Sequence, residues 1–469
     1  MTILAPKEAA FVGDVNVLII GGGGCGLCAA LAVRDAGGDA LVLERDATAL
    51  GSTAMSTGLI PAAGTRFQAE KGIADSPEKF VGDILKKTHG QTDTSMARHL
   101  AEESVPTLDW LVDHHAVPLS LVESFDFPGH SMRRMHGTPN RTGAELMGAL
   151  HNAVSGSGAD VITQAPATAL FAEDDGTIKG VRVERADGTT EDIGCGALVL
   201  ACSGFAGNSK LVEQHIPAIQ DALFFGHPGN KGDALNWGLK LGAEVADVSS
   251  YQGHGSVAGD HGVSIMWAHI TLGGIQVNAS GRRFSNEALG YSEQAAHVTA
   301  QHGGFVWSIY DEEIHERLKE YEDYRDALAT GCVLSADTVE SLCRQTNLPE
   351  SLRNTLETVE QLRVGIGSDE WGRDFSNCKP LKPPFKAVKV NGALFHTQGG
   401  LCVDNSGQVK RQDGSLFPNL FAGGGAARSI SGPSADGYLS GNGLLTATTY
   451  GRLAGFAAAD LVNGTQNEI

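Results

Sequence analysis

Six residues near the start of the chain, Gly21-Gly22-Gly23-Gly24-Cys25-Gly26, satisfy the pattern G-x-G-x-x-G. Glycine at these positions allows a tight turn at Gly21, close approach of backbone N–H groups to a pyrophosphate at Gly23, and close packing of a helix on a strand at Gly26. Glu44 follows at a spacing suited to accepting hydrogen bonds from a ribose diol. The pattern alone is weak in a chain this rich in glycine, so its value depends on the elements around it.

Those elements are the parts of a dinucleotide-binding βαβ unit. The apolar, β-branched run VNVLII at 15–20 is typical of a strand buried on both faces of a parallel sheet. A helix-like stretch, LCAALAVRDAG, follows the glycines, and a second apolar run, ALVLE, ends at Glu44. This order predicts that the glycine turn holds a pyrophosphate at the N-terminus of the helix.

Composition and charge exclude several classes of protein. The chain has 35 basic and 55 acidic residues and no run rich in Lys or Arg, so we expect no nucleic-acid partner. Its eight cysteines show no disulfide-framework spacing, which indicates a reducing compartment. We interpret the C-x-x-C formed by Cys25 and Cys28 as part of the glycine turn rather than as a redox pair. The sequence shows neither a signal peptide nor an apolar run of roughly 18 residues, so we expect a cytoplasmic protein without membrane insertion.

Glycine is unusually frequent, at 61 of 469 residues, against about 33 expected from a typical usage of roughly 7%. The sequence has no Gly-X-Y period and is 42% hydrophobic, so it is neither collagen-like nor disordered. The surplus therefore indicates many places where the backbone turns tightly or approaches a ligand closely. At roughly 150 residues per domain, the length predicts two or three domains.

The character of the chain changes along its length. Region 160–205 reads as short strands separated by DDGT and ADGT turns. Region 310–365 is charged and helical, and the proline-rich joint KPLKPPF at 379–385 precedes a return to strands. The last stretch, 441–462, reads as a long helix rich in small residues.

Nearly the whole sequence resembles the flavoprotein superfamily of soluble fumarate reductases, succinate dehydrogenase flavoprotein subunits and 3-ketosteroid dehydrogenases. The resemblance implies an α/β fold, in which a Rossmann-like FAD-binding domain (1–250 and 396–469) is interrupted by an α+β capping, or substrate, domain (251–395). Besides the glycine turn, these landmarks carry the resemblance in family order: GSTAMSTG (51–58), LVLACSGFAGN (198–208), Gly232-Asp233, VNASGRRFSNE (277–287), FHTQGGL (395–401), LFAGGG (420–425) and YGRLAG (450–455).

The same resemblance implies FAD as the cofactor. Some relatives attach FAD covalently through a histidine, and the matching position here is Ser52, so we expect non-covalent FAD. A glutamate common in the family is absent from Ala422-Gly423-Gly424-Gly425, which removes one expected flavin contact. The FAD contacts predicted from the glycine turn and the matched segments are Gly21, Gly23, Gly24, Cys25, Gly26, Glu44, Arg45, Ser52, Thr53, Ser56, Thr57, Gly58, Ala167, Ala201, Gly204, Asn208, Asp233, Gly424, Gly441, Asn442 and Leu444.

The resemblance also locates candidate catalytic residues. The dicarboxylate enzymes hold fumarate with two arginines and two histidines, and this chain retains histidines at His396 and His254. The two arginine positions correspond to Tyr291 and Tyr438. Exchanging a fixed cation for a phenol removes bidentate carboxylate binding, so a dicarboxylate is a poor fit.

Tyrosines at these positions, and the pair Tyr438-x-Ser440 in particular, are similar to the ketosteroid dehydrogenase branch. The Tyr438 O–H and a backbone N–H of the Ser440–Gly443 turn would then stabilise the oxygen of a developing enolate. Tyr291 or Ser440 would remove the α-proton, while the β-hydrogen leaves as hydride to the flavin. The final helix, beginning near Asn442–Leu444, would direct its positive end toward the flavin.

We therefore predict an FAD-dependent oxidoreductase acting on a CH–CH bond beside a carbonyl. Its substrate would be a cyclic ketone, a ketosteroid-like compound or a keto acid, with an electron acceptor or donor that the sequence does not identify. The first alternative is a fumarate-reductase-like enzyme for a small unsaturated carboxylate, with Arg133 or Arg134 replacing the missing arginines. The second is a non-redox FAD-containing isomerase or binding protein.

Overall fold

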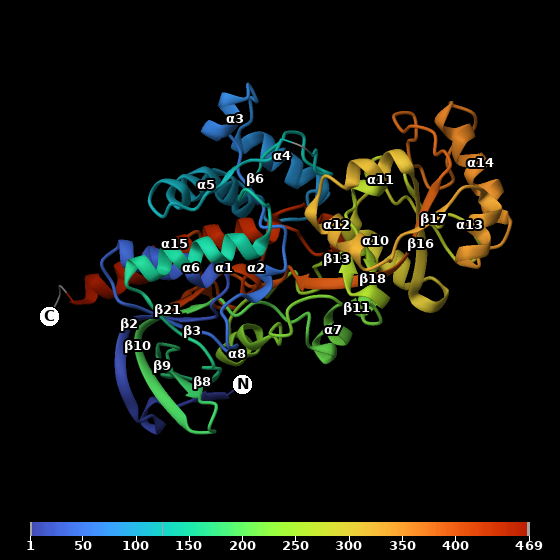
Figure 1. The fold of residues 1–469 in the computed structure, drawn as a ribbon. Helices are drawn as coiled ribbons and strands as arrows, with labels where there is room; N and C mark the ends of the chain where they lie inside the picture. The colour runs from blue at the N-terminus through green and yellow to red at the C-terminus, as the bar shows by residue number, and fades with distance from the viewer. Residues whose placement is uncertain (1, 124, 467–469) are drawn as a thin grey trace. The chain divides into compact units, whose positions relative to one another are not determined.

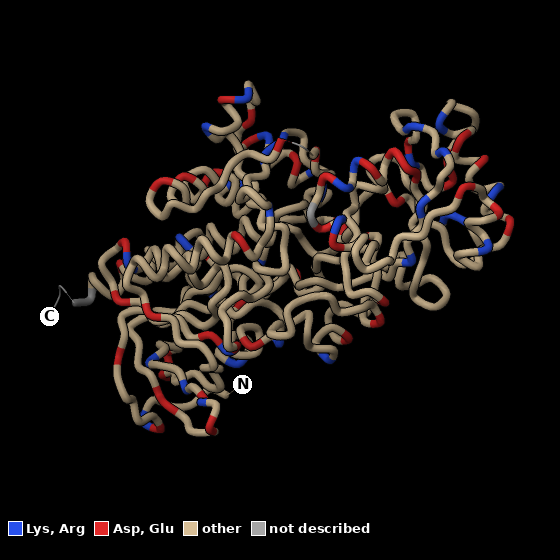
Figure 2. Tube along the Cα trace, in the orientation of Figure 1, with Lys and Arg blue, Asp and Glu red and all other residues tan. Residues whose placement is uncertain are grey.

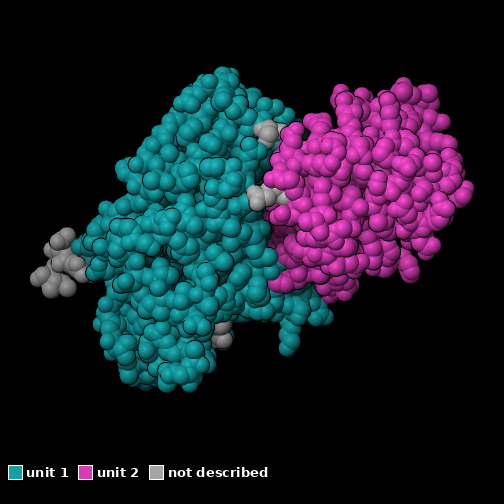
Figure 3. All heavy atoms as spheres, in the orientation of Figure 1, with its two compact units in different colours: residues 1–215, 226–251, 396–469 teal, residues 216–225, 252–395 magenta. Residues whose placement is uncertain are grey.

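The computed structural model describes residues 2–123 and 125–466, and these form two compact units (Figure 3). Unit 1 comprises Met1–His215, Gly226–Tyr251 and His396–Ile469, and unit 2 comprises Ile216–Phe225 and Gln252–Phe395. The predicted domain borders near 250 and 395 lie close to these limits. The segment Ile216–Phe225, which sequence analysis placed in the first domain, belongs to unit 2 because its strand pairs with the sheet of that unit.

A nine-stranded sheet forms the centre of unit 1 (Figure 1). Its parallel part runs in the order β7-β3-β2-β10-β21, so β2 has a neighbour on each side. Val17 and Ile19 pack in one apolar cluster and Leu18 and Ile20 in another, as expected for a strand covered on both faces. The strands are β1 (Thr2–Leu4), β2 (Phe11–Ile20), β3 (Ala40–Leu43), β7 (Asp160–Ile162), β8 (Ala167–Ala172), β9 (Ile178–Glu184), β10 (Thr190–Leu200), β20 (Gln408–Lys410) and β21 (Leu416–Ala422).

Helices α1 (Gly24–Asp35) and α15 (Asn442–Gln466) pack against each other beside this sheet. A Cβ atom at Gly451 would lie 2.4 Å from the Cys25 carbonyl oxygen, and one at Gly455 would lie 2.4 Å from that of Ala29. The small residues of the last helix therefore allow this close approach. Other helices of unit 1 are α2 (Gly51–Ala54), α3 (Arg66–Glu70), α4 (Pro77–Lys87), α5 (Thr94–Asp113), α6 (Gly143–Ser157), α7 (Ser209–His215) and α8 (Asp233–Leu241).

Unit 1 also contains two small sheets. One has three strands, in the order β4 (Ile60–Pro61), β6 (Met135–Gly137) and β5 (Ser120–Leu121). The other pairs β12 (Val245–Ala246) with β19 (Gly400–Leu401). The loop before α15 packs against the three-stranded sheet, since a Cβ atom at Gly441 would lie 2.7 Å from Pro61 Cδ and 3.3 Å from Met135 Sδ.

Unit 2 is built on a seven-stranded, mostly antiparallel sheet with β18 at its centre. Figure 2 shows charged residues at frequent intervals along the helices of this unit that lie within 310–365, in agreement with the charged helical character predicted for that region. The strands are β11 (Leu223–Phe224), β13 (Tyr251–Ala258), β14 (Val263–Ser264), β15 (Ile275–Val277), β16 (Phe305–Asp311), β17 (Leu334–Ala336) and β18 (Phe385–Thr397). The helices are α9 (Ala268–Thr271), α10 (Tyr291–Thr299), α11 (Glu312–Leu318), α12 (Glu322–Ala329), α13 (Val339–Thr346) and α14 (Ser351–Arg363). Among the described residues, no helix combines the length and the apolar character that crossing a membrane requires.

Candidate active site

The glycine turn at residues 21–26, called the phosphate loop below, joins β2 to α1. A Cβ atom at Gly26 would lie 1.8 Å from the Gly21 carbonyl oxygen, and one at Gly21 would lie 2.4 Å from that of Ala201. At Gly23 the nearest atom to an added Cβ is Thr53 Oγ1, at 3.9 Å. Two glycines are thus required by contacts within the protein, while the third leaves its side of the turn open. This arrangement at a helix N-terminus fits a bound pyrophosphate.

Helix α2 and the residues after it form the predicted second flavin loop, which is bonded to the phosphate loop. Thr53 Oγ1 accepts a hydrogen bond from the Gly24 amide at 3.1 Å. Ser56 Oγ donates to the Thr53 carbonyl at 2.7 Å, and the Gly58 amide donates to Ser56 Oγ at 3.1 Å. Thr57, predicted as another contact, is exposed.

Sequence reasoning missed Asn230, a fully buried residue that supports this region. Its Nδ2 donates to Ser52 Oγ at 3.1 Å, and its Oδ1 accepts a hydrogen bond from Ser203 Oγ. Asn230 therefore joins the predicted second flavin loop to the turn that follows β10. No motif in the sequence marks this asparagine, because its partners come from distant segments.

Glu44 directly follows β3 and makes hydrogen bonds within the protein besides the ribose contact that the sequence analysis assigned to it. Its Oε2 accepts from the Gly22 amide at 2.8 Å, and its Oε1 accepts from the Asp46 amide at 2.8 Å. Each carboxylate oxygen still has capacity for one more donor, which leaves room for a ribose hydroxyl. The neighbouring Arg45 pairs with Asp46 at 3.0 Å, and its predicted FAD contact stays a prediction.

The cysteines of the C-x-x-C pattern lie within the first five residues of α1 and are both buried. Burial raises the pKa of Cys25 to about 12 and that of Cys28 still further. Both thiols are therefore protonated and poor nucleophiles at neutral pH, in agreement with the interpretation that they are part of the glycine turn and not a redox pair.

The remaining predicted FAD contacts come from several places in unit 1. Ala167 begins β8, Gly204 and Asn208 follow β10, and Asp233 begins α8. Burial raises the pKa of Asp233. Gly424 has a φ of +56° in the short turn after β21, while Leu444 lies in the first turn of α15 and is buried.

Residues 438–441, called the Tyr438 loop below, lead into α15. The Tyr438 ring is 6% exposed and meets the His396 ring edge to face, with centroids 6.1 Å apart. The Gln398 amide donates to His396 Nδ1 at 3.0 Å, and Ser431 Oγ bonds to Gln398 Oε1 at 2.8 Å and to Asn442 Nδ2 at 3.0 Å. Burial lowers the pKa of His396, so this imidazole is neutral at physiological pH. Asn442 Oδ1 is buried without a partner among the described residues, and so can accept a hydrogen bond from a cofactor.

In unit 2 the predicted catalytic residues His254 and Tyr291 stack on each other, with ring centroids 5.1 Å apart. Phe395 stacks on His254 at 5.4 Å, and Trp267 meets both rings edge on. His254 Nδ1 accepts from the Ser256 amide at 3.1 Å, so the proton of the neutral ring lies on Nε2. Burial lowers the pKa of His254 to about 3. His254 is therefore a neutral ring in an aromatic cluster rather than a cation.

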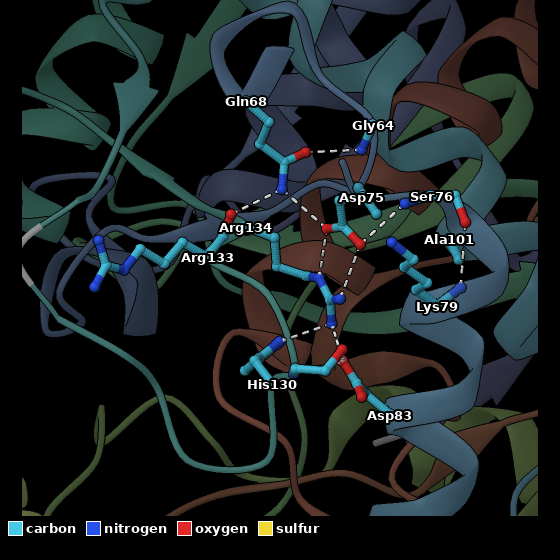
Figure 4. Close-up of polar contacts among 12 residues, drawn as sticks. Gly64, Gln68, Asp75, Ser76, Lys79, Asp83, Ala101, His130, Arg133 and Arg134 are labelled. Atoms are coloured by element: carbon cyan, nitrogen blue, oxygen red, sulfur yellow. Dashed lines mark hydrogen bonds and ion pairs between the residues drawn. The ribbon is translucent and has the colours of Figure 1, made fainter. Parts of the chain in front are cut away.

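The arginine pair has a different arrangement from the one considered in the sequence analysis. Arg134 is fully buried and pairs with Asp75 at 3.0 Å and with Asp83 at 2.5 Å (Figure 4). The hypothesis that Arg134 binds a substrate carboxylate is therefore wrong, because carboxylates of the protein already occupy its guanidinium. Arg133 pairs with Asp126 at 2.6 Å on the surface.

Residues 16–444 match the model of a family described as FAD binding domain. The chain belongs to this family. A probable fumarate reductase, Ifc3 of Shewanella frigidimarina, is 27% identical over 95% of this chain and 74% of its own length. The 4-oxocyclohex-2-ene-1-carboxylate 5-dehydrogenase of Sinomonas cyclohexanicum is 26% identical over 69% of this chain and 61% of its own length. The structure of a 3-ketosteroid-Δ4-(5α)-dehydrogenase from Rhodococcus jostii RHA1, in complex with 4-androstene-3,17-dione, has a TM-score of 0.78 and 25% identity, covering 98% of this chain and 100% of that one.

Membership of the FAD-binding family confirms the predicted superfamily, the fold class and FAD as the cofactor. The chain is an FAD-dependent oxidoreductase. The features of this chain that fit FAD are the open turn at Gly23, the first turn of α1, and Asn442 Oδ1, which has no hydrogen-bond partner in the described part of the chain. When bound, FAD supplies an acceptor for hydride.

Proposed function

We propose that this oxidoreductase desaturates a CH–CH bond beside the carbonyl of a cyclic ketone. The observation that carries the proposal is Tyr438, a buried phenol beside His396 in the loop that leads into α15. A phenol donates a hydrogen bond to a ketone oxygen but offers no fixed charge to a carboxylate. Two of the relatives described above are named for dehydrogenation of a compound with a ring ketone, which supports the same assignment.

The proposed reaction divides two hydrogens between two acceptors. The Tyr438 hydroxyl and a backbone N–H of the Ser440–Gly443 turn donate to the carbonyl oxygen, which stabilises the enolate as the α-C–H bond breaks. A base takes this proton. Bound FAD would supply the acceptor for the hydrogen on the β-carbon and its electron pair as the C=C bond forms. Ser440 in the same loop and Tyr291 in unit 2 are the two candidate bases.

The electrostatics of the candidate residues favour a neutral carbonyl over a dicarboxylate. Burial keeps both His254 and His396 uncharged, and the Arg134 guanidinium is neutralised by two aspartates. The first alternative, a reductase of a small unsaturated carboxylate, depends instead on Arg133, whose side chain is 43% exposed and already paired with Asp126. The similarity to the probable fumarate reductase keeps this alternative in the experiment below.

Anaerobic spectroscopy of the holoenzyme tests the proposal. The oxidised protein is mixed with cyclohexanone, 4-oxocyclohexane-1-carboxylate or a saturated 3-ketosteroid, and the loss of flavin absorbance is followed. In parallel, the dithionite-reduced protein is mixed with fumarate or another enoate, and flavin reoxidation is followed. Reduction by a ring ketone supports the proposal, whereas reoxidation by fumarate without reduction by any ketone would replace it with the first alternative. Ligand-induced spectral shifts without electron transfer in either direction would favour the non-redox alternative.

We also propose that FAD is bound without a covalent link, because Ser52 occupies the position that a histidine takes in covalent relatives. The Ser52 hydroxyl already accepts a hydrogen bond from Asn230. Acid precipitation of the holoenzyme should therefore leave the flavin in the supernatant. Yellow colour retained in the washed pellet would contradict this expectation.

A further inference from the structure

A buried ionic network is centred on Arg134, the residue directly before β6 (Figure 4). Arg134 Nε and Nη2 donate to the two oxygens of Asp75 at 3.0 and 3.1 Å, and Nη1 donates to Asp83 Oδ2 at 2.5 Å. The Asp75 and Arg134 side chains are completely buried, and Asp83 is 11% exposed. Gln68 donates to Asp75, and the Ser131 amide and hydroxyl donate to Asp83. The guanidinium is thus fixed from both sides.

The network fixes the orientation of His130. Arg134 Nη1 lies 3.2 Å from His130 Nδ1, and His130 Nε2 lies 3.0 Å from the Ser440 carbonyl oxygen. A guanidinium can only donate and a carbonyl can only accept, so Nδ1 is the acceptor and Nε2 carries the proton. The Phe80 side chain packs against both the His130 ring and the Arg134 guanidinium. Partial burial and the Arg134 charge lower the pKa of His130 to about 4, which agrees with the neutral tautomer that these partners require.

The His130 segment, residues 129–135, contacts the Tyr438 loop at three positions. A Cβ atom at Gly129 would lie 2.6 Å from Leu439 Cδ1, and one at Gly441 would lie 3.3 Å from Met135 Sδ and 2.7 Å from Pro61 Cδ. The His130 hydrogen bond to the Ser440 carbonyl lies between these contacts along the loop. Of these contacts it is the polar one, and its acceptor is the backbone carbonyl of Ser440, two residues after Tyr438.

We propose that His130, held by Arg134, positions the Tyr438 loop for catalysis. The hydrogen bond to the Ser440 carbonyl fixes the peptide between Ser440 and Gly441, so it sets the direction of the Tyr438 hydroxyl and of the N–H groups that follow. His130 is a positioning residue, because it acts through the loop and not on the substrate. The inference rests on the function proposed above for Tyr438, and it adds a specific residue to that function.

Two substitutions of similar size separate the functions of the two ring nitrogens. In His130→Gln the amide nitrogen can reach the position of Nε2 and donate to the Ser440 carbonyl, whereas in His130→Asn the shorter side chain can serve Arg134 but cannot reach that carbonyl. Displacement of catalytic groups by about 1 Å costs roughly 10²-fold. With a ring ketone that reduces the wild-type flavin, we expect a loss of that order in kcat for His130→Asn, little change in KM, and recovery of most of the turnover in His130→Gln.

His99→Asn is the matched control, because His99 Nε2 also contacts a backbone carbonyl from a distant segment, that of Asn405 at 2.8 Å. It should leave kcat unchanged. A second readout is a double-mutant cycle with Tyr438→Phe. If His130 acts through the Tyr438 loop, His130→Asn should cost much less in the Tyr438→Phe background than in the wild type. Wild-type turnover in His130→Asn, equal loss in His130→Gln, or full additivity in the cycle would each overturn the proposal.

Hydrogen exchange of a peptide spanning 436–445 tests the contact without any substrate. Exchange in the holoenzyme should be faster in His130→Asn than in the wild type and close to wild type in His130→Gln. Unchanged exchange in His130→Asn would overturn the proposal even if a ring ketone is the substrate. If no ring ketone reduces the wild-type flavin, the proposed function fails first, and altered exchange would then support only the structural contact and overturn its catalytic role.

Discussion

Two loops of unit 1 that serve the same cofactor domain are stabilised in opposite ways. The phosphate loop is shaped by close backbone contacts, because a side chain at Gly26 would meet the Gly21 carbonyl and one at Gly21 would meet the Ala201 carbonyl. The Tyr438 loop is supported by side chains from a distant part of the chain, through His130, Arg134 and two buried aspartates. The comparison teaches that a binding turn can be encoded in six adjacent residues, whereas the orientation of a catalytic group depends on a network that no short motif contains.

Substitution in the phosphate loop should have the largest effect. In Gly26→Ala the new Cβ would lie 1.8 Å from the Gly21 carbonyl oxygen, so the backbone of the turn must move. We expect loss of bound FAD, measured as the ratio of flavin to protein absorbance after gel filtration. Gly148→Ala in α6 is the control, because nothing lies within 4 Å of its added Cβ. Relief of a helical glycine should stabilise that variant by roughly 0.5–1 kcal/mol. A stoichiometric flavin content in Gly26→Ala would contradict the steric argument.

Substitution in the ionic network around Arg134 should have the next largest effect. The quantity affected is the free energy of unfolding. Arg134→Met leaves Asp75 and Asp83 as uncompensated buried charges, and loss of one partner in such a site costs about 3–5 kcal/mol. Arg133→Met removes only the surface pair with Asp126, which contributes less than about 1 kcal/mol. Urea denaturation of the two holoenzymes measures both free energies of unfolding. Equal destabilisation by the two substitutions would show that the buried network does not support this region.

The Tyr438 hydroxyl should affect turnover more than stability. Removal of one oxyanion donor costs roughly 10²–10³-fold in kcat, so Tyr438→Phe should lower turnover by this factor while FAD remains bound. Tyr324→Phe is the control in unit 2, since it removes a buried hydroxyl that bonds to Tyr310 at 2.6 Å. That variant should lose stability of the order of 1 kcal/mol but retain its kcat. Unchanged turnover in Tyr438→Phe would remove this residue from the mechanism.

The phosphate loop was predictable from the sequence because its chemistry lies in local spacing. The run from VNVLII to Glu44 gave the strand, turn, helix and strand in order, and the structure contains β2, α1 and β3 there. Resemblance extended this to the whole fold and located Tyr438. The place of Ile216–Phe225 could not be predicted in the same way, because its strand β11 has only two residues and pairs with the distant β18.

The side-chain networks were not predictable, for a related reason. Arg134 and Arg133 are adjacent and chemically identical in the sequence, yet one is fully buried and the other lies on the surface. The difference is made by Asp75 and Asp83, which lie 59 and 51 residues away from Arg134. Asn230 and Ser52 are separated by 178 residues. Polar networks of this kind depend on packing between distant segments. The periodicity of apolar residues along one segment therefore cannot predict them.

Glu44 sharpens the comparison, because its carboxylate makes a charged side-chain contact with the phosphate loop. Its Oε2 accepts from the Gly22 amide, so Glu44→Ala should leave this buried N–H without its partner. Hydrogen bonds to charged groups contribute about 1.5–3 kcal/mol, so loss of the predicted ribose hydrogen bond should weaken FAD binding by roughly 10–100-fold. Glu44→Gln keeps an acceptor of the same length but loses the charge, so its FAD affinity should fall between those of Glu44→Ala and the wild type. Flavin fluorescence during titration of the apoprotein with FAD measures all three dissociation constants. Equal affinities would mean that the backbone alone holds the turn and that Glu44 contributes nothing to the ribose contact.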